Sequence, residues 1–110
     1  MDSILISIKK LLGIGQDQDS FDQDIIMHIN TVFMILMQLG VGPKNGFKIT
    51  SDAEIWSDFL PEGMPLEAVK SYMFLRVRQL FDPPTSSSVA EAANRQIEML
   101  EWRLNVEVDK

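Results

Sequence analysis

Hydrophobic positions are densest between Ser20 and Gly40, and their spacing predicts a long helix. At about 100° per residue, the apolar side chains fall on two arcs of this helix rather than on one. The first arc contains Ile25, Ile26, Ile29, Val32, Phe33 and Leu36. The second arc contains Met27, Met34 and Met37, with Asn30 among them. A surface helix needs only one apolar stripe, so this helix needs cover over most of its circumference.

The same segment carries polar signals for its ends. Ser20 is a candidate N-cap, and Gln23 stands in the capping-box position three residues later. Gly40 stands where a left-handed cap residue is expected. His28 follows Asp24 by one turn, which predicts an i, i+4 hydrogen bond or ion pair between them.

Similar patterns predict three further main helices and one short helix. The predicted elements are a helix over 3–12, a brief helix after Ser51, helices over 65–81 and 88–104, and a short polar tail over Asn105–Lys110. Ser51 with Glu54, and Ser88 with Glu91, fit capping boxes for two of these helices. The sequence therefore predicts an all-α fold, a small bundle of about four main helices plus a short one, in a single domain over residues 1–110.

Apolar residues at helical spacing define the predicted inner arcs. In 3–12 they are Ile4, Ile8, Leu11 and Leu12. In 65–81 they are Leu66, Val69, Met73, Phe74, Val77, Leu80 and Phe81. In 88–104 they are Val89, Ala92, Ala93, Ile97, Leu100 and Leu104. Leu75 and Trp102 lie off these arcs and are predicted to point outward.

Composition narrows the classes of function. The chain has 110 residues, 45% of them hydrophobic, a net charge of −6 and no cysteine. The hydrophobic content is that of a folded globular chain, and the absence of cysteine excludes disulfides and thiolate metal sites. The negative charge argues against a protein held on nucleic acid by phosphate contacts.

Neither a membrane span nor a signal peptide is predicted. Asp24, His28, Asn30 and Gln38 interrupt the central helix, whereas a spanning helix needs about 20 mainly apolar residues. The basic amphipathic helix at 3–12 could lie on a membrane surface, but core packing is the preferred interpretation. We therefore expect no membrane partner and a cytoplasmic chain that is not processed.

Candidate chemistry is sparse. A calcium loop starting at Asp17 would need glycine where Asp22 stands and glutamate where His28 stands, so the acidic cluster is interpreted as helix-start carboxylates. His28 is the only histidine, and no convergent partners for catalysis or metal binding are evident. The serines at 86–88 have no associated base motif. We expect no enzyme, no catalytic or metal-binding residues and no cofactor.

The methionine arc has two possible roles that the sequence leaves open. It is either core, because methionine fills irregular gaps, or a surface between subunits, because one small bundle cannot easily cover both arcs of one helix. Tryptophan is enriched at interfaces, which adds weight to the second role. The residues predicted for an interface with other subunits or with a partner protein are Met27, Asn30, Met34, Met37, Leu75, Trp102, Val106 and Val108.

Five segments of the chain carry a family resemblance. They are FDQDIIMHIN (21–30), QLGVGP (38–43), WSDFL (56–60), AVKSYMFLRVRQLFDPP (68–84) and EWRLN (101–105). In order and spacing they closely resemble the head–tail connector, or adaptor, proteins of long-tailed bacteriophages. The match runs nearly end to end, and the V-R-x-L-F-D-P-P pattern at 77–84 is its most diagnostic part.

The resemblance implies a structural protein of the virion neck. It implies a homo-oligomeric ring, usually of twelve subunits, that docks below the portal protein, receives the stopper or tail-completion protein and lets DNA pass without sequence-specific binding. It further implies that the C-terminal region, here the end of the last helix and the tail, reaches the portal, and that assembly takes place in the bacterial host cytoplasm.

A small helical regulatory DNA-binding or protein-interaction module is the alternative. Against the DNA-binding form, the helices at 65–81 and 88–104 and the FDPPTSSS turn between them are longer than a helix-turn-helix allows.

Overall fold

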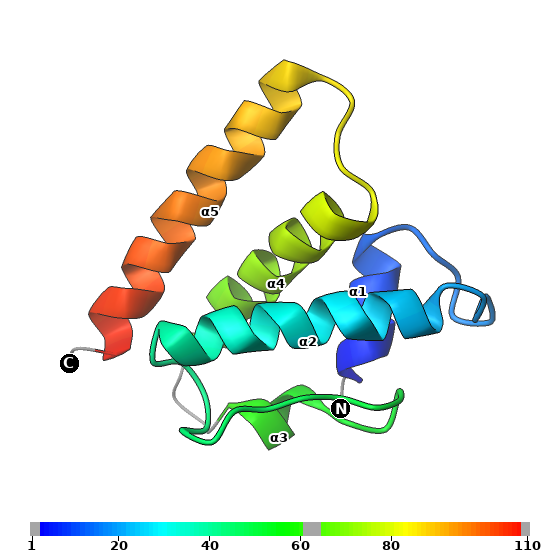
Figure 1. The fold of residues 1–110 in the computed structure, drawn as a ribbon, viewed down its shortest axis with the longest axis horizontal. Coiled ribbons are helices and arrows are strands. Elements are labelled where there is room, and N and C mark those ends of the chain that lie inside the picture. The colour runs from blue at the N-terminus through cyan, green and yellow to red at the C-terminus, as the bar shows by residue number, and fades with distance from the viewer. Residues whose placement is uncertain (1–2, 61–64, 109–110) are drawn as a thin grey trace.

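The computed structural model describes residues 3–60 and 65–108, and this part of the chain is built from helices (Figure 1). In chain order they are α1 (Ile4–Leu11), α2 (Asp22–Gln38), α3 (Trp56–Phe59), α4 (Leu66–Phe81) and α5 (Ser87–Val108). No strand occurs in these residues, although Ser3 and Ile55 form an isolated antiparallel bridge. The all-α prediction is confirmed.

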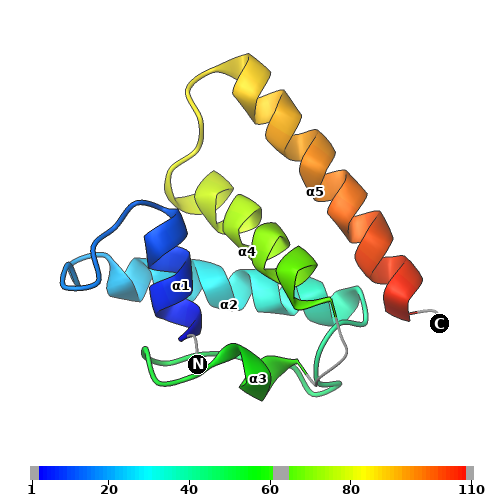
Figure 2. The ribbon, with the colours of Figure 1, turned by 180° about the vertical axis from the view of Figure 1, so that it is seen from behind.

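Helix α2 lies at the centre of the packing. Its first arc is buried as predicted, with Ile25, Ile29, Val32, Phe33 and Leu36 almost inaccessible to solvent. α4 crosses this arc and contributes Val69, Tyr72, Met73 and Val77 to the same core. α1 packs against α2 and α4 on the opposite side from the viewer of Figure 1, and faces the viewer in Figure 2.

Helix α5 runs antiparallel to α4 and stands away from the rest of the molecule. It is held to α4 mainly through Ile97 and Leu104, its two buried residues. Its first turns extend past the end of α4 (Figure 1). The molecule is a slab with extents of 40 × 36 × 21 Å, so it has two broad faces.

The loop after α2 closes the lower part of the core. The Phe33 ring packs against Phe47 and Phe59, with ring centroids 5.1 and 4.6 Å away. Two glycines of the Q-L-G-V-G-P segment, Gly40 and Gly42, have positive φ angles of 87° and 90°. A Cβ on Gly42 would overlap the Phe59 ring, so this glycine lets the loop approach the aromatic cluster.

The predicted end of α2 is confirmed, whereas its predicted start is wrong. After the helix, the Gly40 and Val41 N–H groups donate to the Met37 and Leu36 carbonyls, as in a Schellman motif. At the start, Phe21 and not Ser20 is the cap residue, and no side chain caps the helix. The Asp22 carboxylate instead pairs with the Lys9 ammonium of α1 at 2.9 Å, a long-range contact that fixes where the helix begins.

The other two predicted capping boxes are also wrong. Glu54 accepts the N–H groups of Thr50 and Ser51 and so caps a loop, whereas α3 starts at Trp56 with the Asp58 carboxylate accepting the Ile55 N–H at 3.0 Å. α5 starts at Ser87, one residue early. The hydroxyl of Ser86, not of Ser88, accepts an N–H of its first turn, from Val89 at 3.5 Å.

The predicted polar tail is wrong over residues 105–108, because α5 continues as a helix to Val108. No proline or glycine interrupts this segment, and extending an existing helix is much easier than starting one. Val108 also packs beside Gly40, where a Cβ would lie 2.9 Å from its Cγ1. Residues 109–110 of the predicted tail lie outside the described part of the chain.

Four residues assigned to inner arcs are exposed instead. Leu80 is 48% exposed because the last turn of α4 packs on α2 through Phe81, whose ring lies 5.5 Å from Phe21. Leu11 borders a groove, and Val89 and Ala92 lie on the part of α5 that extends past α4.

His28 contacts an aromatic ring in place of the predicted pairing with Asp24. The Phe81 ring packs edge-on near His28, with 6.4 Å between the ring centroids.

Candidate functional site

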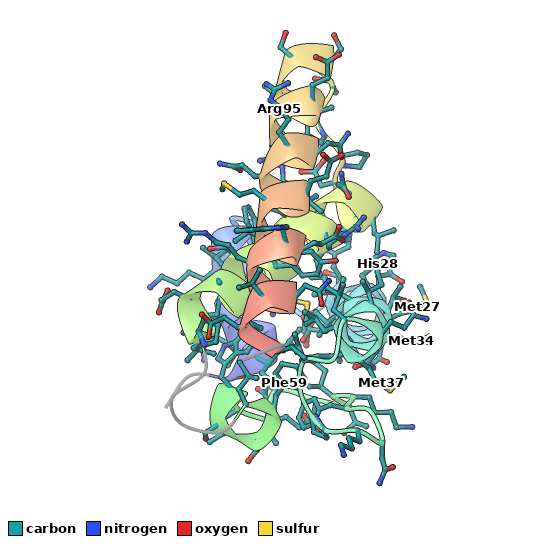
Figure 3. All side chains as sticks on the ribbon, turned by 90° about the vertical axis from the view of Figure 1, so that its left-hand side faces the viewer. Met27, His28, Met34, Met37, Phe59 and Arg95 are labelled. Atoms are coloured by element: carbon teal, nitrogen blue, oxygen red, sulfur yellow. The ribbon has the colours of Figure 1, made fainter. Side chains whose placement is uncertain are left out.

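The methionine arc of α2 lies on the surface of the subunit. We call Met27, Thr31, Met34 and Met37 the Met face. Met27 and Met34 are each 58% exposed, and Met37 is also exposed. Figure 3 shows the three methionines at the outer edge of α2, on the side away from α1 and α5. Of the two roles left open by the sequence, burial in the core of one subunit is therefore excluded for this face.

Asn30, at the border of the Met face, is engaged within the chain. Its side-chain amide donates to the Ile49 carbonyl at 2.9 Å and accepts the Ile49 N–H at 2.8 Å. Ile49 is fully buried, so this pair of hydrogen bonds holds the loop after α2 against the helix. An interface role for Asn30 stays a prediction, and its polar atoms already have partners.

A second exposed apolar stripe runs along α5. It contains Met99, Trp102 and Val106, spaced at three and four residues, and we call it the α5 stripe. Trp102 is 68% exposed, which is unusual for so large an apolar side chain. Val108 is exposed as well, but one of its methyl groups points towards Gly40.

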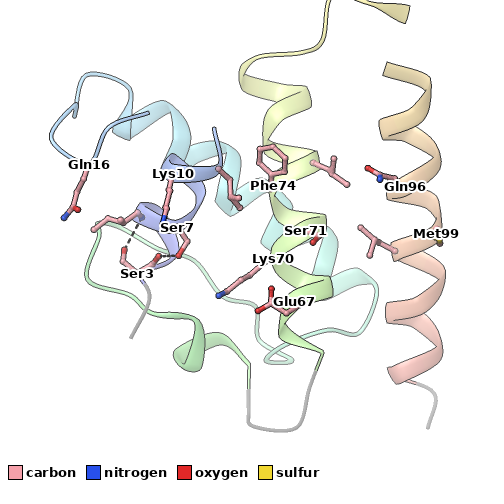
Figure 4. Close-up of a pocket in the computed structure, with 14 residues that line it drawn as sticks. Ser3, Ser7, Lys10, Gln16, Glu67, Lys70, Ser71, Phe74, Gln96 and Met99 are labelled. Carbon is pink, nitrogen blue, oxygen red and sulfur yellow. Dashed lines mark hydrogen bonds between the residues drawn. The ribbon is translucent and has the colours of Figure 1, made fainter. Parts of the chain in front are cut away.

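A groove with a volume of about 890 Å³ opens between α1, α4 and α5. Phe74, Leu75 and Leu100 give it an apolar floor and are half-buried against the core. Leu75, predicted to point outward, faces this open groove, and its interface role stays a prediction. Lys10, Glu67 and Lys70 stand around it (Figure 4). The Lys70 ammonium lies 5.8 Å from the centre of the Trp56 ring. We call this cavity the α1/α4/α5 groove.

The position of the α5 wall is fixed by a polar cluster. The Tyr72 hydroxyl donates to the Glu101 carboxylate at 2.7 Å, and the Arg76 guanidinium donates to both groups, at 3.2 Å to Tyr72 and 2.6 Å to Glu101. Burial, together with the hydrogen bond to Glu101, raises the pKa of Tyr72 to about 12. Burial alone would raise the pKa of Glu101, but the hydrogen bonds from Tyr72 and Arg76 outweigh it and lower the pKa. The cluster connects α4 to α5 across 25 residues of sequence.

A buried ion pair connects α1 to the start of α2. Lys9 is only 2% exposed, and its ammonium bonds the Asp22 carboxylate at 2.9 Å and the Gln16 carbonyl at 3.2 Å. The sequence placed Lys9 and Asp22 at helix ends but could not pair them, because they belong to different helices. The Tyr72, Arg76 and Glu101 cluster was missed for the same reason, although Tyr72 and Arg76 one turn apart were a partial signal.

Two tests for other kinds of site concern the described residues only. Within 3–60 and 65–108, no three or more His, Asp or Glu side chains gather as they would around a metal ion. Among the helices of the same residues, none has the length and hydropathy needed to cross a bilayer.

Comparison with known proteins then gives the family. The sequence profile of a family described as "Phage connector protein" matches residues 4–110. The chain belongs to this family. No curated protein and no solved structure matches the connector. The resemblance carried by the five segments is thereby confirmed, and the connector is a component of a phage particle with a role at the head–tail junction.

The family segments correspond to contacts in the fold. Phe81 of the L-F-D-P-P pattern packs on Phe21 and near His28 of the first segment. Glu101 of the E-W-R-L-N segment bonds Tyr72 and Arg76 of the fourth. The segments that identify the connector therefore contain residues that hold its helices together, and they also contain Met27 of the Met face and Trp102 of the α5 stripe, which are exposed in the single subunit.

Proposed function

We propose that the connector is the subunit of a ring that joins the portal of the phage head to the stopper or tail-completion protein. Membership of the phage connector family across residues 4–110 is the observation that carries this proposal. The ring, of twelve subunits by the family resemblance, has no enzymatic step and no cofactor.

The exposed apolar surfaces support assembly into a ring. The Met face and the α5 stripe lie on different elements, so each subunit offers separate apolar patches to neighbouring copies and to other proteins of the neck. Contacts between unlike patches produce closed rings when the rotation between subunits closes. Large exposed apolar patches are rare on monomeric proteins and mark interaction surfaces, and Trp102, Met27 and Met34 are each more than half exposed.

The charge of the connector supports the passage of DNA. With a net charge of −6, a closed ring of connectors presents a strongly acidic assembly to the phosphate backbone. Electrostatic repulsion keeps the DNA from binding to the wall of the channel. The DNA can therefore pass rapidly through the ring.

The C-terminal end of α5 is proposed to face the portal. This end carries Trp102 and Val106, and α5 continues there as a helix up to Val108. A helical end is a more rigid docking element than the polar tail expected from the sequence. Tryptophan is also among the residues that most often dominate the binding energy of an interface.

Light scattering tests the proposal. The mass of the connector is measured alone and after mixing with the purified portal protein of the same phage, and we expect a ring-sized species at least in the presence of portal. A connector that stays monomeric in both samples and does not bind the portal contradicts the proposal. Salt-sensitive binding of duplex DNA at micromolar protein would favour the regulatory DNA-binding alternative instead.

A further inference from the structure

Two exposed features of the connector, the Met face and the α1/α4/α5 groove, lie on opposite broad faces of the slab. The Met face is on the side of α2 that is turned towards the viewer of Figure 1, as the side view in Figure 3 shows. The α1/α4/α5 groove opens on the other side, where α1 lies in front of α2 (Figures 2 and 4). One face projects flexible apolar side chains, and the other is hollow.

We propose that the Met face of one subunit docks into the α1/α4/α5 groove of the next, so that each subunit contributes one ridge and one groove. This inference rests on the proposed ring and specifies the pair of surfaces that forms it. The occupant of the groove is thus a second copy of this chain, bound through its α2.

The shapes and chemistry of the two surfaces match. The groove has α4 as its floor and α1 and α5 as its walls, which is the form of a trough that receives a helix (Figure 4). Phe74, Leu75 and Leu100 offer apolar surface at the bottom, and Met99 stands at the rim. Methionine side chains adapt to irregular apolar surfaces, so Met27 and Met34 are suited to fill such a groove.

The charges beside the two surfaces are also complementary. Asp24 is exposed one turn before Met27 at the start of α2. On the groove, the exposed Lys10 stands on the wall formed by α1. An acidic residue beside the Met face and a basic residue on a wall of the groove favour this orientation and disfavour two Met faces meeting each other.

The thickness of the slab agrees with a closed ring. Twelve copies that repeat at the 21 Å thickness give a mean radius of roughly 40 Å. Subunits 36 to 40 Å across then leave an opening roughly 40 Å wide, which admits a DNA double helix. Stacking the slabs through their broad faces therefore produces a ring with a usable channel.

Cross-linking tests the pairing, because the chain has no cysteine of its own. Met34→Cys on the Met face and Ser71→Cys on the groove are made in separate chains, mixed, assembled on the portal and treated with a short bismaleimide. We expect a covalent dimer that contains one chain of each variant. The control mixes Met34→Cys with Thr85→Cys, whose thiol lies in the exposed α4–α5 connection outside both surfaces, and should give little product.

The outcomes separate this inference from the proposed function. If the variants assemble on the portal but the Met34 and Ser71 thiols do not cross-link, or if Met34→Cys cross-links mainly to itself, the pairing is wrong and the ring stands. If the unmodified connector never assembles, both proposals fail together.

A complementation experiment tests the direction of the contact. Met34→Glu puts a carboxylate on the Met face, and Ser71→Glu puts a larger, charged side chain into the α1/α4/α5 groove. Each variant alone should therefore fail to assemble. When the two are mixed, the intact groove of the first and the intact ridge of the second should form a dimer that cannot extend. The absence of any dimer in the mixture, under conditions in which the unmodified connector assembles, would contradict ridge-to-groove docking.

Discussion

Individual residues decide how closely the loop after α2 can approach the core. Gly42 combines a φ of 90° with a backbone so near the Phe59 ring that no side chain fits. Gly15, in contrast, has open space around the position of a Cβ. The two glycines therefore make a matched pair for measuring the cost of a methyl group.

We predict that Gly42→Ala lowers the free energy of unfolding by about 2 kcal/mol or more, from left-handed backbone strain and overlap with Phe59. Gly15→Ala should change it by less than about 0.5 kcal/mol, as is usual for exposed positions. Urea unfolding followed by circular dichroism measures both. Equal effects of the two substitutions would show that the Phe59 contact does not limit this loop.

Asn30 is a second residue whose role depends on one partner. We predict that Asn30→Ala destabilises the fold by about 2 kcal/mol, because it leaves the N–H and carbonyl of buried Ile49 without their hydrogen bonds. Asn45→Ala, at an exposed position of the same loop, is the control and should be nearly neutral. Amide hydrogen exchange at Ile49 gives the direct measurement, with loss of protection expected only for Asn30→Ala.

At the scale of whole elements, α5 is attached to the fold through α4. Its hydrophobic anchor consists of two buried residues, Ile97 and Leu104, and its first turns project beyond α4. The Tyr72, Arg76 and Glu101 cluster supplies a charged contact between α4 and α5. Because α5 forms one wall of the groove, this cluster also sets the width of the groove.

The cluster predicts a pH dependence of stability. Since the pKa of Glu101 is lower in the folded than in the unfolded state, its contribution is present at neutral pH and is lost as the pH falls through the lowered value. Glu101→Gln should therefore lower Tm at pH 7, and the difference from the unmodified connector should shrink below about pH 4. Glu98→Gln, an exposed change on the same helix, should show no such convergence in thermal scans between pH 3 and 7.

At the scale of the whole molecule, the connector keeps more apolar surface than one subunit buries. Met27, Met34, Met99 and Trp102 are all more than half exposed, and they lie on two elements that face different directions. The residues of the core, in contrast, are nearly inaccessible to solvent, so the exposure is not a sign of a loosely packed fold. Covering this surface by neighbours is the physical basis of the proposed ring.

Met34→Glu tests that basis. Because the side chain is exposed, a carboxylate there remains in water, and we predict normal helical circular dichroism with a change in unfolding free energy below about 0.5 kcal/mol. Assembly with the portal, measured by light scattering, should be abolished. Val89→Glu, which adds the same charge to an exposed apolar position at the far end of α5, should assemble normally. Normal assembly of Met34→Glu would remove the Met face from the interface.

The sequence by itself was sufficient to locate the helices and to recognise the family. Periodicity located all four main helices and the short one, and it separated the buried arc of α2 from its methionine arc, because both depend on residues close together in the chain. Gly40 was recognised as the cap of α2 for the same local reason. The order of the five segments identified the phage connector family.

Only the tertiary structure decided which apolar residues remain exposed and which polar residues are paired. Leu80 and Leu11 were assigned to the wrong side because their surroundings depend on where α1, α4 and α5 end relative to one another. The Lys9–Asp22 pair, the Asn30–Ile49 bonds and the Tyr72–Glu101 contact join residues from different segments, and they determine where helices begin and how they are held. The placement of the Met face and the groove on opposite faces likewise follows from how the helices pack, which helical periodicity alone does not encode.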